Sequence, residues 1–280
     1  MKSDQEPASD NRRAKHLAMN RKAWDAYQSA YMEFHLKEYP DFFEYLSGGG
    51  VFLSDFEVRL AGEVAGLAVL DVCCASSADE AFSWENLGAN VIACDISPVA
   101  IEIAKRNAVR LKSHIRFVVA DAQELAPIAS DSVDLLYGRY LCWFEDLEKA
   151  LRAWYRVVRP GGRLLLVTPH PTCCCLESEG ETCRIVRSYY DESPDYHDFT
   201  GTDMADRHGG WGQRHPCVEF FHPTWRIINA VVAAGFCLRH VEEPTVSRCR
   251  DEEHCTRLPH SLVVLAEKLR AKEDVEPDGE

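Results

Sequence analysis

The stretch that decides the fold is AVLDVCCASSADEAFSWENLGANVIACDISP, residues 68–98. Residues 68–72 and 90–94 are short apolar runs, which is typical of strands that are buried on both faces of a parallel sheet. Residues 78–87 between them carry an apolar stripe that fits a helix, and Gly88 follows where a glycine often ends one. The stretch therefore predicts a strand, a tight loop, a helix and a second strand, which make half of a mononucleotide-binding unit.

An acidic residue ends the second predicted strand. In such units the loop after the first strand meets the ligand, and an acid about 20 residues further on holds ribose hydroxyls. Asp95 is in that position, and Ile96 follows it. We therefore expect both residues to contact a nucleoside.

The loop after the first strand resembles the cofactor-binding loop of class I S-adenosylmethionine (SAM)-dependent methyltransferases, in which an Asp or Glu precedes Gly-x-Gly-x-Gly. Here residues 71–77 read DVCCASS, so small residues replace all three glycines. They still allow close approach of a ligand, but a positive φ would strain them where glycine would not be strained. The resemblance implies that SAM is the cofactor and that this loop contacts it through Asp71, Cys73, Cys74, Ala75 and Ser77.

The following segments match the same family in order and spacing. Residues 98–111 predict a helix capped by Ser97, and residues 115–120 predict a third strand that ends at Asp121-Ala122. The resemblance implies that this pair lies against the adenine and that Asp121 accepts a hydrogen bond from its exocyclic amine. The alternative is that Asp121 only caps the next turn.

Residues 132–138 predict a fourth strand, and residues 139–144 predict the loop at its carboxyl end. Open α/β sheets bind ligands at that edge. We therefore expect Tyr137, Gly138 and Arg139 to contact the cofactor, and Tyr140 to contact the substrate as a catalytic residue.

The segment DLEKALRAWYRVVRPGGRLLLVTPHP, residues 146–171, resembles the family's fourth helix, RPGG turn and fifth strand. Pro160 and the two following glycines predict a sharp reversal between the helix and a strand at residues 164–168. A helix at residues 223–234 and strands at residues 236–241 and 261–266 match the end of the family's sheet.

The predicted fold class is therefore α/β, with a Rossmann-like, seven-stranded, doubly wound sheet. The core spans residues 67–170 and is completed by residues 223–268. We expect an N-terminal helical lid at residues 15–66 and a cap inserted after the fifth strand at residues 171–222. Two tails complete the chain, a disordered one at residues 1–14 and a charged one at residues 269–280.

An aromatic face follows the helical pattern of residues 13–46. Trp24, Tyr27, Tyr31, Phe34 and His35 recur at spacings of three and four. They either fill the core or cover the cofactor, as N-terminal helices do in many small-molecule methyltransferases. Because aromatic faces attract cations, Tyr27 and Tyr31 are predicted to lie near the sulfonium.

The cap at residues 171–222 is rich in aromatic residues and histidines, and long insertions of this kind are usually functional or disordered. By analogy it covers the substrate. His208, His215 and His222 are evenly spaced, but the glycines between them exclude one continuous helix. The sequence therefore predicts no metal site there.

Methyl transfer from SAM is an in-line displacement, and a base is needed only if the acceptor must lose a proton. His170, after the fifth strand, and His222, at the end of the cap, are the candidate bases. Each has a structural alternative, since His170 can close a turn and His222 can satisfy a buried backbone group.

Composition narrows the class of partner. The chain has 280 residues and a net charge of −14, and no basic cluster suits nucleic acid. No apolar run reaches the length of a membrane span, and the N-terminus lacks the apolar core of a signal peptide. We therefore expect a cytoplasmic enzyme that acts on a small molecule.

Three hypotheses remain open at this point. The first is a small-molecule methyltransferase. The second is a SAM-utilising enzyme with another outcome, such as cyclisation of the aminobutyrate arm with release of methylthioadenosine, or a rearrangement. The third is a non-catalytic SAM-binding protein, which the presence of both Asp95 and Asp121 disfavours.

Overall fold

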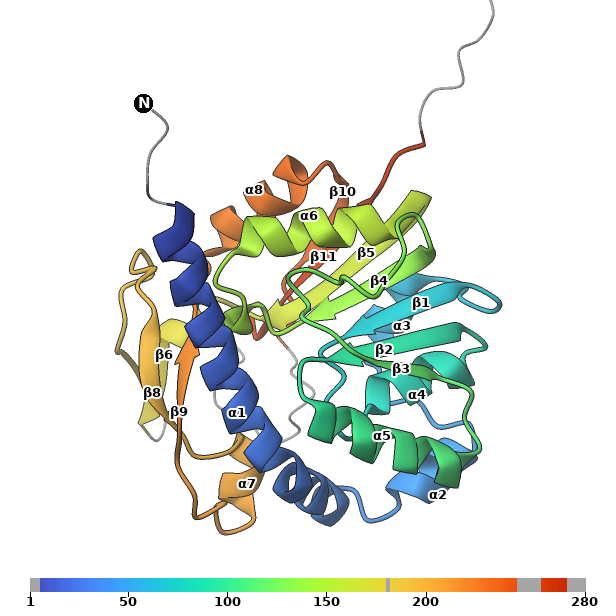
Figure 1. The fold of residues 1–280 in the computed structure, drawn as a ribbon, viewed down its shortest axis with the longest axis horizontal. Coiled ribbons are helices and arrows are strands. Elements are labelled where there is room, and N and C mark those ends of the chain that lie inside the picture. Colours follow the sequence, from blue (N-terminus) through green and yellow to red (C-terminus); the bar gives the residue numbers. More distant parts are fainter. Residues whose placement is uncertain (1–5, 180–181, 246–257, 271–280) are drawn as a thin grey trace, which may run out of the picture.

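A computed structural model describes residues 6–179, 182–245 and 258–270. A seven-stranded sheet lies at its centre, in the order β10-β11-β5-β4-β1-β2-β3 (Figure 1). The five strands from β5 to β3 are parallel to one another, and β11 runs antiparallel to both β5 and β10. The predicted Rossmann-like fold class is confirmed.

The stretch at residues 68–98 folds as predicted. β1 (Ala68–Val72) pairs in parallel with β2 (Asn90–Asp95), and α4 (Asp79–Asn86) connects them. The next helix, α5 (Pro98–Leu111), has the predicted bounds because the Ser97 side chain accepts a hydrogen bond from the Ala100 amide at 3.0 Å and proline occupies the first turn.

The rest of the sheet differs from the prediction at one point. β5 (Val158–Pro169) already pairs with β4 at Val158, so the RPGG segment lies within the strand and not in a separate turn. Gly161 adopts a φ of 81° there. The remaining core elements are β3 (Arg116–Val119), β4 (Val133–Arg139), α6 (Leu147–Val157), α8 (Thr224–Ala233), β10 (Cys237–Glu242) and β11 (Ser261–Glu267).

Alternating strand residues divide the core into two layers. Val69, Leu135 and Tyr137 face the layer that includes α4 and α5. Leu70, Leu136 and Leu164 face the opposite layer, which α6 and α8 cover. This period of two is what a strand buried on both faces requires.

The N-terminal helices differ from the prediction at both ends. α1 (Glu6–Glu38) already begins inside the segment predicted to be disordered up to residue 14. It ends before Pro40, so the helical pattern of residues 13–46 is split into α1 and α2 (Phe42–Ser47), and α3 (Asp55–Ala61) follows. The polar start of α1 is held by ion pairs, since Arg12 contacts Glu145 and Arg13 contacts Asp121.

The inserted segment 171–222 forms two small hairpins and packs against α1. An amide side chain of α1 joins the two parts, because Asn20 donates to the Val218 carbonyl at 2.8 Å and accepts from the Val218 amide at 2.9 Å. The elements of this region are η2 (Cys173–Cys175), β6 (Leu176–Glu179), β7 (Thr182–Ile185), β8 (Asp195–Phe199), α7 (Asp203–Arg207) and β9 (His215–Glu219).

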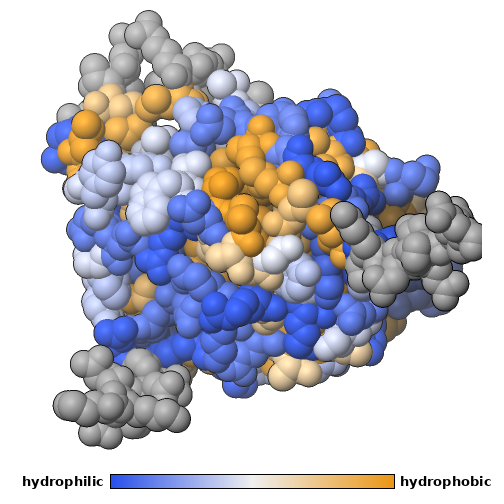
Figure 2. Space-filling view, turned by 90° about the horizontal axis from the view of Figure 1, so that it is seen from above, coloured by the Kyte–Doolittle hydropathy of each residue, from blue (hydrophilic) through white to orange (hydrophobic). Residues whose placement is uncertain are grey.

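The face seen from above is mixed, with a central apolar area surrounded by hydrophilic residues and a second apolar area near its edge (Figure 2). The helix α8 lies on this side of the molecule, and it exposes Trp225 and Val232. Within the described ranges, no helix combines the length and hydropathy that a membrane crossing requires.

Candidate active site

The loop between β1 and α4 keeps the backbone shape of a glycine loop without its glycines. Cys73, Ala75 and Ala78 adopt φ values of 64°, 53° and 49°. The first two are positions where the family has glycine, and the third lies one residue after Ser77. Burial raises the pKa of the Cys73 and Cys74 thiols, so both remain neutral small residues. The strain expected from the sequence is present in this loop.

This strain predicts a stabilising substitution. A left-handed residue other than glycine costs about 1–2 kcal/mol, whereas glycine adds roughly 0.5–1 kcal/mol of chain entropy to the unfolded state. Ala75→Gly is therefore expected to raise the free energy of unfolding by up to about 1 kcal/mol, as measured by urea denaturation. Ala81→Gly, inside α4, is the matched control and should lower it by about 1 kcal/mol. Equal losses for both variants would contradict the account of loop strain.

α1 and α5 hold this loop from both sides. The Gln28 side-chain carbonyl accepts from the Ser76 amide at 3.0 Å, and the Ser76 hydroxyl donates to the Gln28 main-chain carbonyl at 3.1 Å. Asn107 of α5 donates to the Ser76 carbonyl at 3.0 Å. The loop conformation therefore depends on α1 as well as on its own sequence.

Asp95 lies at the carboxyl end of β2 and is bound to the same loop. Its carboxylate accepts from the Ala75 amide at 3.0 Å and from the Ser97 amide at 2.8 Å. Burial raises the pKa of Asp95 to about 6, against the two backbone hydrogen bonds, which favour the ionised form. A carboxylate that is held but not neutralised by a cation suits the hydroxyls of a ribose.

A hollow of about 320 Å³ opens beside Asp95, between α1 and the ends of β2 and β3. Its walls are apolar except for Asp121 and Arg21, which suits a purine. Its lining residues are Ala14, Leu17, Ala18, Arg21, Ile96, Val119, Ala120 and Asp121.

Two groups hold the Asp121 carboxylate at this hollow. One oxygen accepts from the Arg13 guanidinium at 3.0 Å, and the other accepts from the Gln123 amide at 2.9 Å. Burial nevertheless raises the pKa of Asp121, and the charge of Arg13 only partly offsets this effect. The neighbouring carbonyl of Ala122 accepts from Trp154 Nε1 at 2.8 Å, which fixes the position of the pair.

A polar cluster lies beyond the loop, at the start of α4. Arg139 forms an ion pair with Glu80 and donates to the Tyr140 hydroxyl at 2.9 Å. The Ser77 hydroxyl donates to Asp79 at 2.9 Å and lies 3.5 Å from the Tyr31 hydroxyl. Burial raises the pKa of Tyr31, so its hydroxyl stays protonated. These groups can hold the charged amino-acid end of a ligand whose nucleoside lies in the hollow.

Known proteins with related sequences share this region of the chain. A family model described as a methyltransferase domain matches residues 70–166. Demethylmenaquinone methyltransferase from Thermus thermophilus is 31% identical over 156 residues, which are 55% of this chain and 66% of that protein. The chain belongs to the class I SAM-dependent methyltransferase family. The cofactor of this family is SAM, as the resemblance of residues 68–98 implied.

Solved structures of a methyltransferase and of a cyclase show the same fold. A SAM-dependent methyltransferase from Mesorhizobium loti superposes with a TM-score of 0.59 at 24% identity, over 76% of this chain and 95% of that one. The [4+2]-cyclase SpnF superposes with a TM-score of 0.51 at 16% identity, over 77% of this chain and 80% of that one. The fold therefore occurs in proteins whose names indicate different reactions.

The sequence match to curated methyltransferases is partial. It spans 66% of the Thermus protein and between 24% and 47% of the length of seven other relatives. The family model ends at residue 166, so the cap at residues 171–222 lies outside the matched domain.

Two of the residues predicted to touch the methyltransferase cofactor lie in the core of the sheet instead. The Tyr137 ring is fully buried against Trp84, and its hydroxyl donates to Glu57 of α3. Gly138 leaves room for a neighbouring ring, because a Cβ there would lie 2.4 Å from Trp154 Cζ3. The structure gives both residues a packing role in the core, and Arg139 is the first residue of the segment in the polar cluster.

The candidate bases are tied to other parts of the protein. The ring nitrogens of His170 lie 2.7 Å from the Thr172 hydroxyl and 2.9 Å from Glu243, so this imidazole closes a turn. His222 Nε2 lies 2.8 Å from the Phe144 carbonyl, and burial lowers its pKa. The structural alternatives therefore describe both histidines. Tyr140 is the candidate whose ring lies partly exposed beside Arg139.

The aromatic face of α1 divides between two contacts. Tyr31 lies beside Ser77 of the loop, whereas Tyr27 is fully buried with its hydroxyl 3.0 Å from the Thr202 hydroxyl and its ring against Phe199 and Trp211 of the cap. Tyr27 is therefore placed in the core between α1 and the cap, away from the loop.

Sequence reasoning missed the polar residues of α1. His16, Asn20 and Gln28 are buried and contact the cap or the loop. A signal was available, since positions 16, 20, 23 and 27 continue the aromatic stripe at helical spacing. Buried polar residues on such a stripe indicate contacts that are specific rather than merely apolar.

Proposed function

We propose that this protein binds SAM at the carboxyl ends of β1–β4, beneath α1, and methylates a small molecule held under the cap. The observation that carries the proposal is the hollow of about 320 Å³, which is lined by Asp121 and by Ile96, the residue that follows Asp95. Bound SAM supplies a methyl group on a positively charged sulfur. The chain contributes binding and alignment, and alignment is the larger part of such catalysis.

Each part of the ligand has a proposed partner. Asp95 holds the ribose, and Ile96 and Asp121 hold the adenine. The resemblance implied these roles for the two acids, Asp95 at the ribose and Asp121 at the adenine. The loop residues Cys73, Cys74, Ala75 and Ser77 are proposed to contact the part of SAM that joins the ribose to the amino-acid end. Arg139, paired with Glu80, and Tyr31, beside Ser77, both belong to the polar cluster and are proposed to hold the amino-acid end.

Product analysis tests the reaction. Incubation with SAM and a mixture of candidate acceptors should yield S-adenosylhomocysteine only when the acceptors are present, as measured by mass spectrometry. Release of methylthioadenosine from SAM alone would instead show that the aminobutyrate arm is attacked, and the methyl-transfer proposal would be wrong. SAM binding without any turnover, for every acceptor class tried, would favour the non-catalytic alternative.

The raised pKa of Asp95 predicts a pH dependence of SAM affinity. Ribose hydroxyls donate to the ionised carboxylate, so binding lowers this pKa below its value of about 6 in the free protein. The affinity for SAM is therefore highest above about pH 6, where Asp95 is ionised, and falls about tenfold for each pH unit below it. Calorimetric titration at about pH 5 and about pH 8 measures this change, and Asp95→Asn should flatten it. An affinity that stays constant in the wild type, or a slope that survives in the variant, would contradict the assignment.

A further inference from the structure

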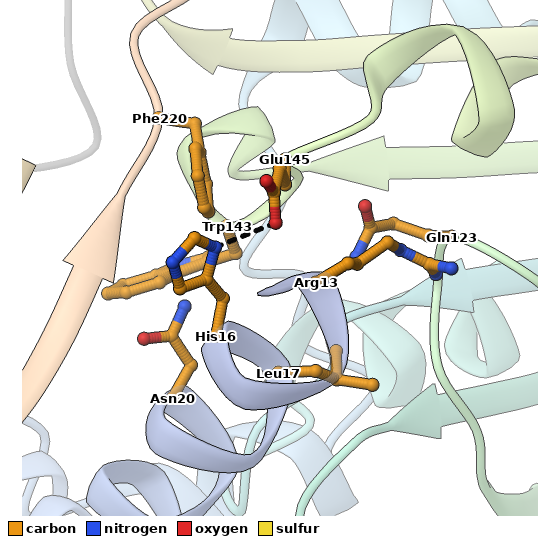
Figure 3. A pocket seen from close by; sticks show the side chains of 8 residues that line it. All are labelled: Arg13, His16, Leu17, Asn20, Gln123, Trp143, Glu145 and Phe220. Carbon is orange, nitrogen blue, oxygen red and sulfur yellow. Dashed lines mark hydrogen bonds and ion pairs between the residues drawn. The ribbon is translucent and has the colours of Figure 1, made fainter. Parts of the chain in front are cut away.

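A buried histidine links α1 to the cap and to the loop after β4. His16 Nδ1 lies 2.7 Å from the Glu145 carboxylate, and His16 Nε2 lies 2.7 Å from the Tyr196 hydroxyl. The three side chains come from α1, from the loop before α6 and from β8 of the cap. Figure 3 shows the His16 ring pointing toward Glu145, with Phe220 and Trp143 around it. We call Tyr196, His16 and Glu145 the proton relay.

The charges around the relay fix the direction of its hydrogen bonds. The other Glu145 oxygen accepts from Arg12 Nε at 3.0 Å, so both oxygens of this carboxylate accept hydrogen bonds. A carboxylate only accepts, so His16 Nδ1 carries the hydrogen toward Glu145. His16 Nε2 is then the acceptor, and the Tyr196 hydroxyl donates to it. Arg13 is the remaining charged group that lines this site.

Packing holds the imidazole in this orientation. Its ring lies 5.6 Å from the Phe220 ring and 5.5 Å from the Tyr196 ring, and only 5% of the residue is exposed. Such an arrangement, in which a carboxylate orients a histidine that accepts a proton from a hydroxyl, is the general design of an activated hydroxyl group.

The relay lies next to the proposed cofactor hollow. A small cavity of about 10 Å³, which is room for about one water molecule, adjoins His16, and Leu17 lines both this cavity and the hollow that contains Ile96 and Asp121. Tyr196 is 57% exposed at the other end, so its hydroxyl group can be approached from the cap side. One end of the relay is thus buried and charged, and the other is accessible.

We propose that this relay removes the proton of the methyl acceptor, with Tyr196 as the catalytic residue and His16 and Glu145 as positioning residues. The inference rests on the proposed function. The acceptor hydroxyl gives its proton to the Tyr196 oxygen as the Tyr196 proton moves to His16 Nε2, and Glu145 stabilises the imidazolium. The acceptor oxygen bonds to the methyl carbon while the carbon–sulfur bond breaks, and that electron pair stays on sulfur. His16 then releases the proton to water.

The relay indicates a class of acceptor. A tertiary amine or thioether has no proton to lose, so a built base serves only an acceptor that is protonated at neutral pH. The Tyr196 ring, which is largely exposed on the cap, suits stacking with an aromatic acceptor. The structure therefore points to a weakly acidic aromatic hydroxyl, such as a phenol.

Nitrogen NMR tests the relay without turnover. In protein labelled with 15N at histidine, the His16 signals, assigned by their loss in His16→Gln, should show a hydrogen on Nδ1 and none on Nε2. Tyr196→Phe should shift the Nε2 signal, and the matched change Tyr190→Phe, at an exposed cap tyrosine, should not. A hydrogen found on Nε2 in the wild type would overturn the proposed direction of proton transfer.

Two phenols test the catalytic role in the same proteins. With 4-methoxyphenol, which stays protonated, Tyr196→Phe should lower kcat/KM about 100-fold or more, because a positioned base contributes roughly that factor. With 4-nitrophenol, which is largely ionised at mildly alkaline pH, the loss should be less than about threefold. Tyr190→Phe should leave both rates unchanged.

The outcomes separate this inference from the proposed function. Equal losses for the two phenols, or none, would overturn the relay, as would failure of the wild type to methylate either phenol while it binds SAM. Absence of SAM binding, by calorimetry, would instead contradict the proposed function itself. Unchanged SAM affinity in Tyr196→Phe is expected in either case and shows that the variant is folded.

Discussion

Asp95→Asn is expected to weaken SAM binding by roughly 10- to 150-fold at neutral pH. Hydrogen bonds to a charged group contribute about 1.5–3 kcal/mol, and asparagine keeps only one of the acceptor oxygens. The carboxylate is buried and already oriented by the Ala75 and Ser97 amides, so little of its effect is lost to solvent. Isothermal titration calorimetry with SAM measures the change.

Asp134→Asn is the matched control for this variant. Asp134 also accepts a backbone hydrogen bond, from the Ala68 amide at 2.8 Å, but it lies at the opposite edge of the sheet, where β1 begins. Its replacement should leave SAM affinity within about twofold. A similar loss for both variants would show a general effect on the sheet, and no loss for Asp95→Asn would remove Asp95 from the site.

Gly138→Ala is expected to destabilise the fold by about 1–3 kcal/mol or more. The added methyl group would lie 2.4 and 2.6 Å from two ring carbons of Trp154. Trp154 is fully buried and its Nε1 donates to the Ala122 carbonyl, so the ring has little freedom to move. Urea denaturation followed by circular dichroism measures the loss.

Gly48→Ala provides a comparison for this substitution. Gly48 has an ordinary φ of −82°, and a Cβ there would be 3.4 Å from its nearest neighbour. The expected change in unfolding free energy is below about 0.5 kcal/mol. If Gly138→Ala were equally harmless, Gly138 would not be a packing residue, and its predicted contact with the cofactor would regain support.

Local patterns were enough to predict the core elements. The apolar runs of β1 and β2 and the Ser97-Pro98 start of α5 depend only on neighbouring residues, and the structure has them at or within one residue of the expected bounds. The start of α1 was missed because residues 6–14 are polar, and their helix is stabilised by partners more than 100 residues away. Local composition cannot report such partners.

The site was predictable only in part, for a similar reason. Acids at strand ends follow from the order of the elements, so Asp95 and Asp121 could be named in advance. Successive residues of β4 point to opposite faces of the sheet, so a shift of one residue changes which side chain lies on which face. Tyr137 faces α3 and α4, whereas Gly138 faces α6. The proton relay joins three segments that only the tertiary fold brings together.

A crystal structure of the protein with SAM tests the central claim most directly. The account predicts electron density for the adenosyl group in the hollow lined by Ile96 and Asp121, with the ribose hydroxyls within hydrogen-bond distance of the Asp95 carboxylate. Density for SAM elsewhere, or a ribose that does not contact Asp95, would contradict it.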